Sequence, residues 1–234
     1  MVTGTRARSY DEMVDALAEG LPMLQDTLSG LTPEDWQRPT FLRPPESGKP
    51  PWTVLQLAAH FDVFMGLTMP LVAEPMSMSA QPVVDRASFY ISVSDRSKVS
   101  PVIYQYIVDH AEGHTPATIR DQVGKTFSQA MEAIKTTPPD TIGPGFFGPM
   151  RLDEFVATRL VETQVHGMDL TDALGAPPLH MPRTTVMAAE VLDEVLARRA
   201  VPGRPVDLEG DDMGFIRAAA GRGEYPDPRL PVVG

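Results

Sequence analysis

The sequence predicts an all-α protein with an up-and-down four-helix bundle at its centre and additional helices around it. Apolar residues recur at steps of three and four over several capped segments of bundle length. Very few residues alternate with the two-residue period of a strand over any useful length. Helices of this kind, joined by loops, bury their apolar stripes against one another, which favours a bundle.

The first two predicted helices begin at recognisable capping residues. Ser9 and Glu12 have the spacing of a capping box, and apolar residues at helical spacing follow them. Thr53 caps the second helix, a strongly apolar segment over residues 54–72. Pro70 should bend or end this second helix, because a proline removes a backbone donor and crowds the preceding turn.

The remaining elements follow from the same signals. Helices are expected over residues 100–110, 115–135, 151–174, 184–199 and 212–220. The segment 136–150 is rich in Pro and Gly and should be irregular. Between residues 74 and 100 the Pro, Ser and Met content blurs the pattern, which leaves residues 86–93 as either a brief helix or an extended piece.

Length and charge limit the classes of protein and partner. A chain of 234 residues is long enough for one good core with a small appendage. We therefore expect a helical domain over residues 1–200 and a short C-terminal extension over residues 201–234. The net charge of -11 argues against a nucleic-acid partner, because phosphate binding needs clustered Lys and Arg.

The N-terminus and the cysteine count set the expected compartment and chemistry. The first residues lack an apolar signal region, and no stretch reaches the roughly 18 uninterrupted apolar residues of a membrane span. We expect a cytoplasmic protein without a membrane partner, either a monomer or a homodimer. The chain contains no cysteine, so a catalytic thiol must arrive with a substrate or cosubstrate.

Three residues on two predicted helices form a candidate metal site. Glu162 and His166 stand four residues apart on one helix, which leaves them about 40° apart on the same face. His60 lies on the apolar second helix, where a neutral imidazole needs a binding partner. Facing helices of a bundle supply metal ligands from such positions. Zinc and similar ions accept this ligand set, and three protein ligands leave one position open.

Spacing alone leaves other interpretations open. A Glu/His pair four residues apart is more often solvated on a helix surface, and a histidine on an apolar face is more often hydrogen-bonded in the core. The neighbourhood favours the metal site, because Gly167 interrupts the helix at a cost of about 1 kcal/mol and indicates a close approach. Asp169 could orient a ligand imidazole. His110 and His114 also stand four apart, but at a fraying helix end.

Three stretches together resemble a known family: TPEDWQRPT, PPWTVLQLAAHFDVF and FVATRLVETQVHGMDLTDALG. They are similar to the mycothiol-dependent maleylpyruvate isomerase family, within the DinB-like superfamily of metal-binding four-helix bundles. A Trp-x-x-Pro stretch is present at Trp36, and a helix start of the Gly-Trp-Thr-Val type at Trp52, with Pro51 where Gly is common. A later motif, Arg-x-x-Glu-x-x-x-His-Gly-x-Asp, is complete at residues 159–169. The resemblance covers roughly residues 9–200.

The resemblance implies a function for the candidate metal site. The family's ligands fall on His60, Glu162 and His166, the same three residues that the spacing offers. A bound divalent ion, zinc first and nickel, iron or manganese as alternatives, would hold the sulfur of the cosubstrate mycothiol as thiolate. The thiolate would then attack an electrophilic small molecule, which results in isomerisation or in S-transfer.

Further site residues follow from the same resemblance. Asp169 would support the metal ligands indirectly, and Arg159 and Arg222 are candidates for binding an anionic group. These three residues complete the expected catalytic machinery. The segment over residues 74–100 is a candidate lid or pocket wall, although none of its residues matches a motif.

The C-terminal region departs from the expected family pattern. We expect members to carry a sizeable α+β domain after the bundle, whereas here only about thirty residues follow Pro202, so this region should be truncated. The resemblance therefore does not identify the substrate. Two other classes of function stay open: a metal-dependent hydrolase and a non-catalytic small-molecule-binding bundle. A hydrolase should turn over without a thiol. A binding module should tolerate loss of Glu162 without losing its ligand.

Overall fold

The fold is described from a computed structural model that places residues 8–42, 49–76, 82–94, 100–199 and 203–233. The helices are α1 (Tyr10–Ser29), α2 (Val54–Gly66), α3 (Thr68–Ala73), α4 (Arg86–Val93), α5 (Ser100–Glu112), α6 (Pro116–Thr136), α7 (Leu152–Leu174), α8 (Pro182–Arg199) and α9 (Asp212–Ala219). Short 3-10 helices η1 (Asp35–Gln37) and η2 (Val206–Leu208) and the strands β1 (Ile142–Gly145) and β2 (Gly148–Arg151) complete the elements.

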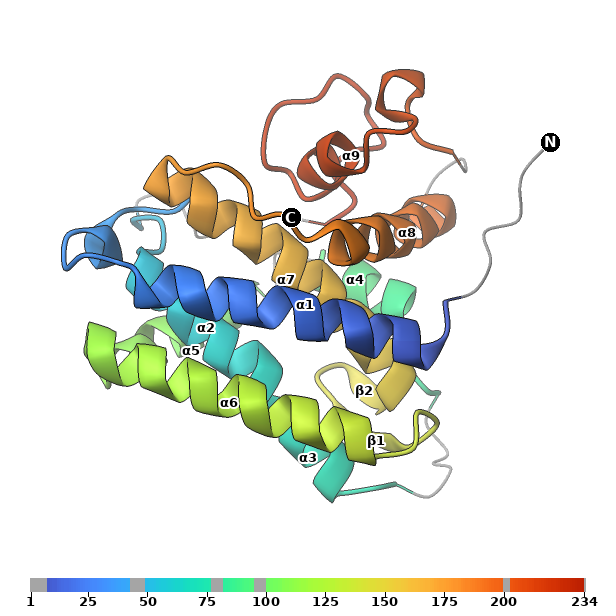
Figure 1. The fold of residues 1–234 in the computed structure, drawn as a ribbon. Coiled ribbons are helices and arrows are strands. Elements are labelled where there is room, and N and C mark those ends of the chain that lie inside the picture. The colour runs from blue at the N-terminus through green and yellow to red at the C-terminus, as the bar shows by residue number, and fades with distance from the viewer. Residues whose placement is uncertain (1–7, 43–48, 77–81, 95–99, 200–202, 234) are drawn as a thin grey trace.

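The helices α1, α6, α2 and α7 form the central bundle, in that order around its axis (Figure 1). Each of these four helices packs against the next one, and α7 packs back against α1. The helices α1 and α2 follow one another along the chain but lie at diagonally opposite corners of the bundle. Outside the bundle, α5 covers α2, α8 covers α7 and α1, and α9 packs on α8. The predicted helical bundle with additional helices is confirmed.

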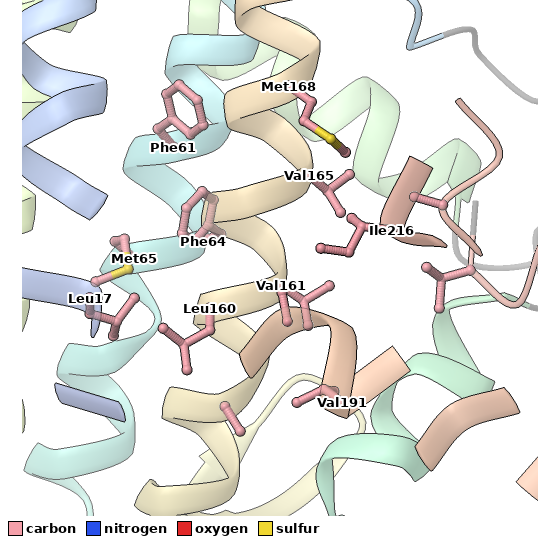
Figure 2. Close-up of a cluster of buried hydrophobic side chains, with 14 of the residues drawn as sticks. Leu17, Phe61, Phe64, Met65, Leu160, Val161, Val165, Met168, Val191 and Ile216 are labelled. Carbon is pink, nitrogen blue, oxygen red and sulfur yellow. The ribbon is translucent and has the colours of Figure 1, made fainter. Parts of the chain in front are cut away.

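The hydrophobic core continues from the bundle into the outer helices. Figure 2 shows side chains of α1, α2 and α7 beside residues of α8 and α9, including Leu17, Phe64, Leu160, Val191 and Ile216. Most of the residues of α7 are buried, because this helix has neighbours on several sides. A polar side chain on α7 is consequently surrounded by protein, so its charge must find a partner there.

Local sequence signals fix the ends of the bundle helices. Ser9 and Glu12 make the predicted capping box of α1, and Thr53 begins α2 with a second capping box. Gly175 ends α7 in the left-handed conformation, at φ 64°, which a residue without a Cβ adopts at little cost. The predicted helix bounds agree with the observed ones to within a few residues, the exact end of each helix depending on its cap.

The segment between α6 and α7 is a β-hairpin, so the prediction that residues 136–150 are irregular was wrong. β1 and β2 pair antiparallel, and Pro144 lies opposite Pro149. Gly145 and Gly148 close a two-residue loop and form a hydrogen-bonded pair. The next pair, Pro144 and Pro149, is therefore a non-hydrogen-bonded pair, in which the backbone nitrogens point away from the partner strand. Proline therefore costs no ladder hydrogen bond here, and a pattern usually typical of loops forms a short strand pair.

The apolar second helix divides into α2 and α3 at Leu67. Pro70 lies in the first turn of α3, where its missing N–H would have had no helical partner. The continuous stretch Val54–Ala73 is long and apolar enough to cross a membrane by length and composition, with a mean hydropathy of 1.3. However, 56% of this apolar segment is buried inside the bundle, as is typical of a core helix.

The C-terminal segment packs on the bundle through charged as well as apolar contacts. Phe215 and Ile216 of α9 are fully buried against the core. Arg217 forms a bidentate ion pair with Asp172 near the end of α7, at 2.6 and 2.8 Å. The extension expected over residues 201–234 is thus an integral part of the packed structure in its described residues, 203–233.

Candidate metal centre

Two bundle helices bring the three predicted ligands together. His60 comes from α2, and Glu162 and His166 come from consecutive turns of α7. One potential ligand atom from each residue lies within 4.8 Å of the other two. The side chains retain 12%, 16% and 10% exposure, so the cluster is nearly enclosed but open on one side.

The spacing of the three ligand atoms fits a small divalent ion. The Nε2 atoms of His60 and His166 are 3.1 Å apart, and Glu162 Oε2 lies 3.4 and 3.2 Å from them. Tetrahedral bonds of about 2.0–2.1 Å separate neighbouring ligand atoms by about 3.3 Å. An anionic oxygen and two imidazole nitrogens that face one point form a donor set that a cation stabilises. The residues present therefore fit a zinc-like ion.

Asp169 lies behind His166, as the sequence predicted for an indirect supporting residue. Its Oδ2 atom is 2.8 Å from Nδ1 of His166, on the side of the ring opposite to the cluster. Because the carboxylate accepts a hydrogen bond, it favours the tautomer with a proton on Nδ1 and a lone pair on Nε2. That tautomer is the one that binds a metal through Nε2.

The two histidines differ in their electrostatic environment. Burial, together with the positive charge on His166, lowers the pKa of His60 to about 4. Burial also lowers the pKa of His166, but the hydrogen bonds to Asp169 and Glu162 outweigh it and raise the pKa above its ordinary value. Glu162 is buried, which raises its pKa, yet its hydrogen bonds to both histidines hold that pKa well below its ordinary value. Without an ion, the surroundings therefore favour the ionised carboxylate of Glu162 and make His166 the more basic of the two histidines.

Arg222 reaches the site from the segment that follows α9. Its Nε and Nη2 atoms donate to the two oxygens of Asp169, each at 2.8 Å. The Asp169 side chain is fully buried, and this bidentate pair supplies the compensating charge. The chain of contacts runs from Arg222 through Asp169 to His166, and so connects the C-terminal segment with the ligand cluster.

Arg159 is buried beneath the cluster rather than exposed to it. It is 1% exposed, donates to the backbone oxygen of Phe64 at 2.6 Å, and stacks over the ring of Phe155 at 4.4 Å. Its positive charge helps to hold the pKa of Glu162 low, after the larger effects of the two histidines. The contacts of Arg159 and Arg222 are internal, which supports positioning roles for both residues. Binding of an anionic group by either residue stays a prediction.

Tyr90 is a residue of the site that the sequence did not indicate. Its hydroxyl lies 3.0 Å from Glu162 Oε1 and 2.9 Å from the backbone oxygen of Thr158. Tyr90 belongs to α4, within the segment 74–100 for which we expected a lid or pocket wall. Residues 77–81 and 95–99 of that segment lie outside the described residues. An N-cap at Asp85 was the signal that could have identified this helix.

The second histidine pair has a different arrangement. His110 Nε2 lies 2.9 Å from Asp62 Oδ2, and Gln122 and Thr126 from α6 also donate to that carboxylate. The ring of His114 packs edge-on against His110, with 5.1 Å between the ring centroids. These contacts tie α5 and α6 to α2. They resemble a buried hydrogen-bond network more than a ligand cluster.

The fold and the site together define a helical bundle with a cluster of His60, Glu162 and His166 in its core that could hold a metal ion. The chain matches the model of the mycothiol maleylpyruvate isomerase N-terminal domain over residues 23–171. This match includes all three ligand residues and most of the bundle. The chain therefore belongs to the mycothiol maleylpyruvate isomerase family, which is a family of enzymes.

Solved structures show the same fold. The chain is similar to a crystal structure of the mycothiol-dependent maleylpyruvate isomerase, with a TM-score of 0.62 and 15% sequence identity over 94% of this chain. A variant of that enzyme with one histidine replaced by alanine matches equally well. Either comparison covers 96% of the neighbour, which leaves no room there for a large unmatched domain. No curated protein matches the chain.

Proposed function

We propose that this protein is a metal-dependent enzyme that uses a low-molecular-weight thiol, mycothiol, either to isomerise an electrophilic small molecule or to transfer the thiol sulfur to it. The observation that carries the proposal is the ligand cluster of His60, Glu162 and His166 at the spacing of a tetrahedral ion. The family supports mycothiol as the thiol. The absence of cysteine from the chain means that the nucleophilic sulfur comes from a cosubstrate.

The residues of the site divide into ligands and positioning residues. His60, Glu162 and His166 would hold the ion, zinc first and nickel, iron or manganese as alternatives. Asp169 fixes the ring of His166, and Arg222 keeps Asp169 ionised within the protein. Arg159 adds positive charge beneath Glu162 and so keeps this ligand anionic.

A divalent ion held by His60, Glu162 and His166 would act as a Lewis acid and would keep the cosubstrate sulfur as thiolate near neutral pH. For isomerisation, the sulfur adds to one carbon of a conjugated double bond, which becomes a single bond and rotates. Expulsion of the thiolate then restores the double bond, so the thiol is returned unchanged. For S-transfer, the carbon adjacent to the new S–C bond takes up a proton and the thioether is released.

The surroundings of the site are consistent with a small organic substrate. The ligand side chains are 10–16% exposed, and the rings of Trp52 and Phe64 pack beside His60. Apolar walls exclude water from a reactive sulfur. As part of the proposal, the enzyme acts in the cytoplasm, as a monomer or homodimer, without nucleic-acid or membrane partners.

The test uses protein in which cobalt replaces the native ion. Addition of mycothiol should produce an intense sulfur-to-metal charge-transfer band, and an electrophilic substrate such as maleylpyruvate should turn over only when thiol is present. Glu162→Ala protein, which lacks one ligand, should show no band. Turnover of an ester or amide without thiol would replace the proposal with a hydrolase. If neither band nor turnover occurs, the bundle would be a binding module.

A further inference from the structure

We propose that Tyr90 is a positioning residue that directs Glu162 to the ion through one oxygen. This inference rests on the proposed function, because it concerns the same metal centre. The two oxygens of Glu162 have different neighbours: Oε1 lies 3.0 Å from the Tyr90 hydroxyl, and Oε2 faces the Nε2 atoms of His60 and His166. A carboxylate held in this way offers one atom to the ion.

The Tyr90 hydroxyl has a single proton and two acceptors within reach. They are Glu162 Oε1 and the backbone oxygen of Thr158, at 3.0 and 2.9 Å. A hydrogen bond to an ionised acceptor is roughly twice as strong as one between neutral groups. The proton is therefore shared between the two acceptors, and the larger share goes to Glu162. Tyr90 is 2% exposed, so water does not compete for this bond.

The helix α4 is held along α7 in a defined register. Arg86 contacts Glu154 at the start of α7, and Tyr90, one turn further along α4, contacts Thr158 and Glu162. Glu154, Thr158 and Glu162 follow one another at steps of four, so they share one face of α7. The two helices therefore run in the same direction, and the salt bridge at Arg86 sets the position at which Tyr90 meets Glu162.

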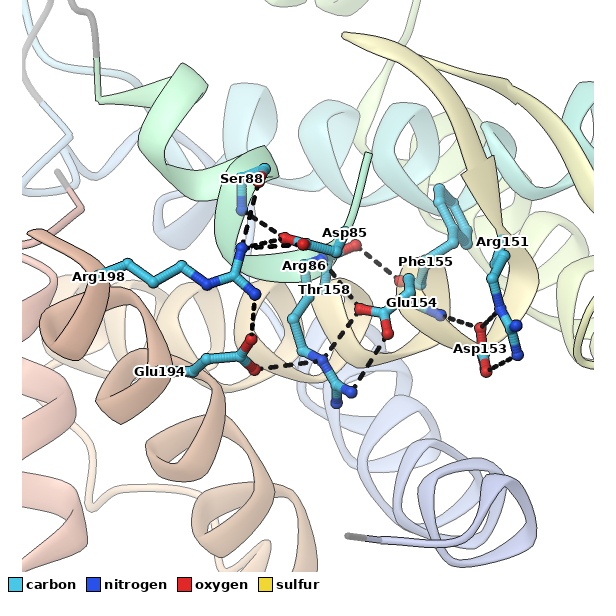
Figure 3. Close-up of polar contacts among 10 residues, drawn as sticks. All are labelled: Asp85, Arg86, Ser88, Arg151, Asp153, Glu154, Phe155, Thr158, Glu194 and Arg198. Atoms are coloured by element: carbon cyan, nitrogen blue, oxygen red, sulfur yellow. Dashed lines mark hydrogen bonds and ion pairs between the residues drawn. The ribbon is translucent and has the colours of Figure 1, made fainter. Parts of the chain in front are cut away.

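A second set of contacts attaches α4 to α8 (Figure 3). Arg198 forms two hydrogen bonds with Asp85, at 2.7 and 2.8 Å, and Asp85 also caps the first turn of α4. Glu194 of α8 lies 2.7 Å from Arg198 and 3.5 Å from Arg86. These ion pairs hold the N-terminal end of α4 against two helices. Such a support is what a residue needs to orient a metal ligand reproducibly.

One ligand atom from each residue leaves space for a cosubstrate. If Glu162 bound through both oxygens, it would take an additional position beside the two histidines. The bond to Tyr90 prevents this by occupying Oε1. The open position at the ion is then available to a thiol sulfur, as the proposed function requires.

The experiment compares Tyr90→Phe with a matched control, Tyr106→Phe. Tyr106 lies on α5, is 58% exposed, and does not contact the ligand cluster in the described structure. We measure zinc affinity by competition with a chelator and record the visible spectrum of cobalt-loaded protein. Tyr90→Phe should weaken zinc binding by roughly 10- to 100-fold, the range for residues that orient a ligand. The cobalt d–d bands should lose intensity, because a second carboxylate oxygen raises the coordination number.

A role limited to packing would give a different result. Tyr90→Phe retains the ring, and its melting temperature without metal should stay within about 4 °C of wild type. Tyr106→Phe should resemble wild type in affinity and spectrum. If Tyr90→Phe binds zinc as tightly as wild type and shows the wild-type cobalt spectrum, the inference is wrong while the metal site stands. If wild type itself binds neither ion, the proposed function fails together with it.

Discussion

Two of the three candidate ligands at the centre of this protein, His166 and Glu162, are held by a neighbour that the ion would not touch. His166 is oriented by Asp169, and Asp169 is held by Arg222. Glu162 is oriented by Tyr90. His60 differs, because its Nδ1 atom is buried and has no hydrogen-bond partner among the described residues. The position of His60 follows from packing against Trp52 and the bundle rather than from a polar contact.

Replacement of Asp169 by asparagine tests the support of His166. An amide is a weaker acceptor than a carboxylate, so Asp169→Asn should lower metal affinity or activity by about 10- to 100-fold. Chelator competition measures the affinity. Asp172→Asn is the matched control, since Asp172 lies three residues further along α7 and pairs only with Arg217 among the contacts of the described structure. Equal affinities for wild type and Asp169→Asn would reduce Asp169 to a structural acid.

The pH dependence of metal binding follows from the two histidines. His60 is neutral near pH 7, because burial lowers its pKa to about 4. His166 has a raised pKa and must release its proton before an ion binds. Affinity should therefore be constant above that raised pKa and fall by about tenfold per pH unit below it, as expected for one released proton.

Replacement of Asp169 should move this decline in affinity to lower pH. Asp169→Asn removes a hydrogen bond that raises the pKa of His166, so the decline in affinity should begin at a lower pH than in wild type. Affinity can be followed between about pH 5 and 8, where histidine titrates. A decline that begins at higher pH in the variant, or an affinity without any pH dependence, would contradict this assignment.

At the scale of elements, the helices were predictable and the hairpin was not. Ser9, Thr53 and Gly175 are local signals, and each of them lies at the helix boundary that it caps. The hairpin depends on contacts distant in sequence. The N–H of Met76 donates to the backbone oxygen of Ile142 in β1, and the N–H of Val84 donates to that of Pro149 in β2. Residues that precede and follow the segment 77–81 therefore both bind the hairpin. No pattern within residues 136–150 encodes these contacts.

The hairpin gives a test of the packing between β1 and α3. A Cβ added at Gly143 would lie 1.9 Å from the backbone oxygen of Leu71, which cannot move as a flexible side chain could. Gly143→Ala should therefore destabilise the fold by about 1–3 kcal/mol or more. Urea unfolding measures this free energy. Gly66→Ala is the control, since its Cβ would lie 3.9 Å from Thr126, and wild-type stability for Gly143→Ala would refute the close approach.

At the scale of the whole molecule, the candidate metal centre is assembled from distant parts of the chain. The ligand motif on α7 and its position relative to His60 were predictable, because the bundle brings facing helices together. The contacts of Tyr90 and Arg222 were not. Tyr90 and Arg222 come from segments outside the bundle. Their contacts with Glu162 and Asp169 depend on how α4 and the segment after α9 pack against α7. Asp169 carried a predicted supporting role, but its partner in the C-terminal segment had no local signal.

Replacement of two arginines in the C-terminal segment tests how much their ion pairs with α7 stabilise the protein. Arg222→Met would leave the fully buried Asp169 with His166 as its remaining charge partner, and loss of the bidentate arginine should cost about 3–5 kcal/mol of unfolding free energy. Arg217→Met removes a pair whose side chains are 35% and 21% exposed, and should cost about 1 kcal/mol or less. Denaturant unfolding without metal compares them. Equal losses would mean that the Asp169 pair is not specially buried.

The central claim is that His60, Glu162 and His166 hold one divalent ion, and elemental analysis of purified protein tests it most directly. Wild type prepared without chelators should contain about one ion per chain, as three ligands with one open position require. His166→Ala should lose most of the metal while it keeps the helical circular dichroism spectrum. Wild type that carries no stoichiometric metal, and that gains none on titration with zinc, nickel, iron or manganese, would contradict the account.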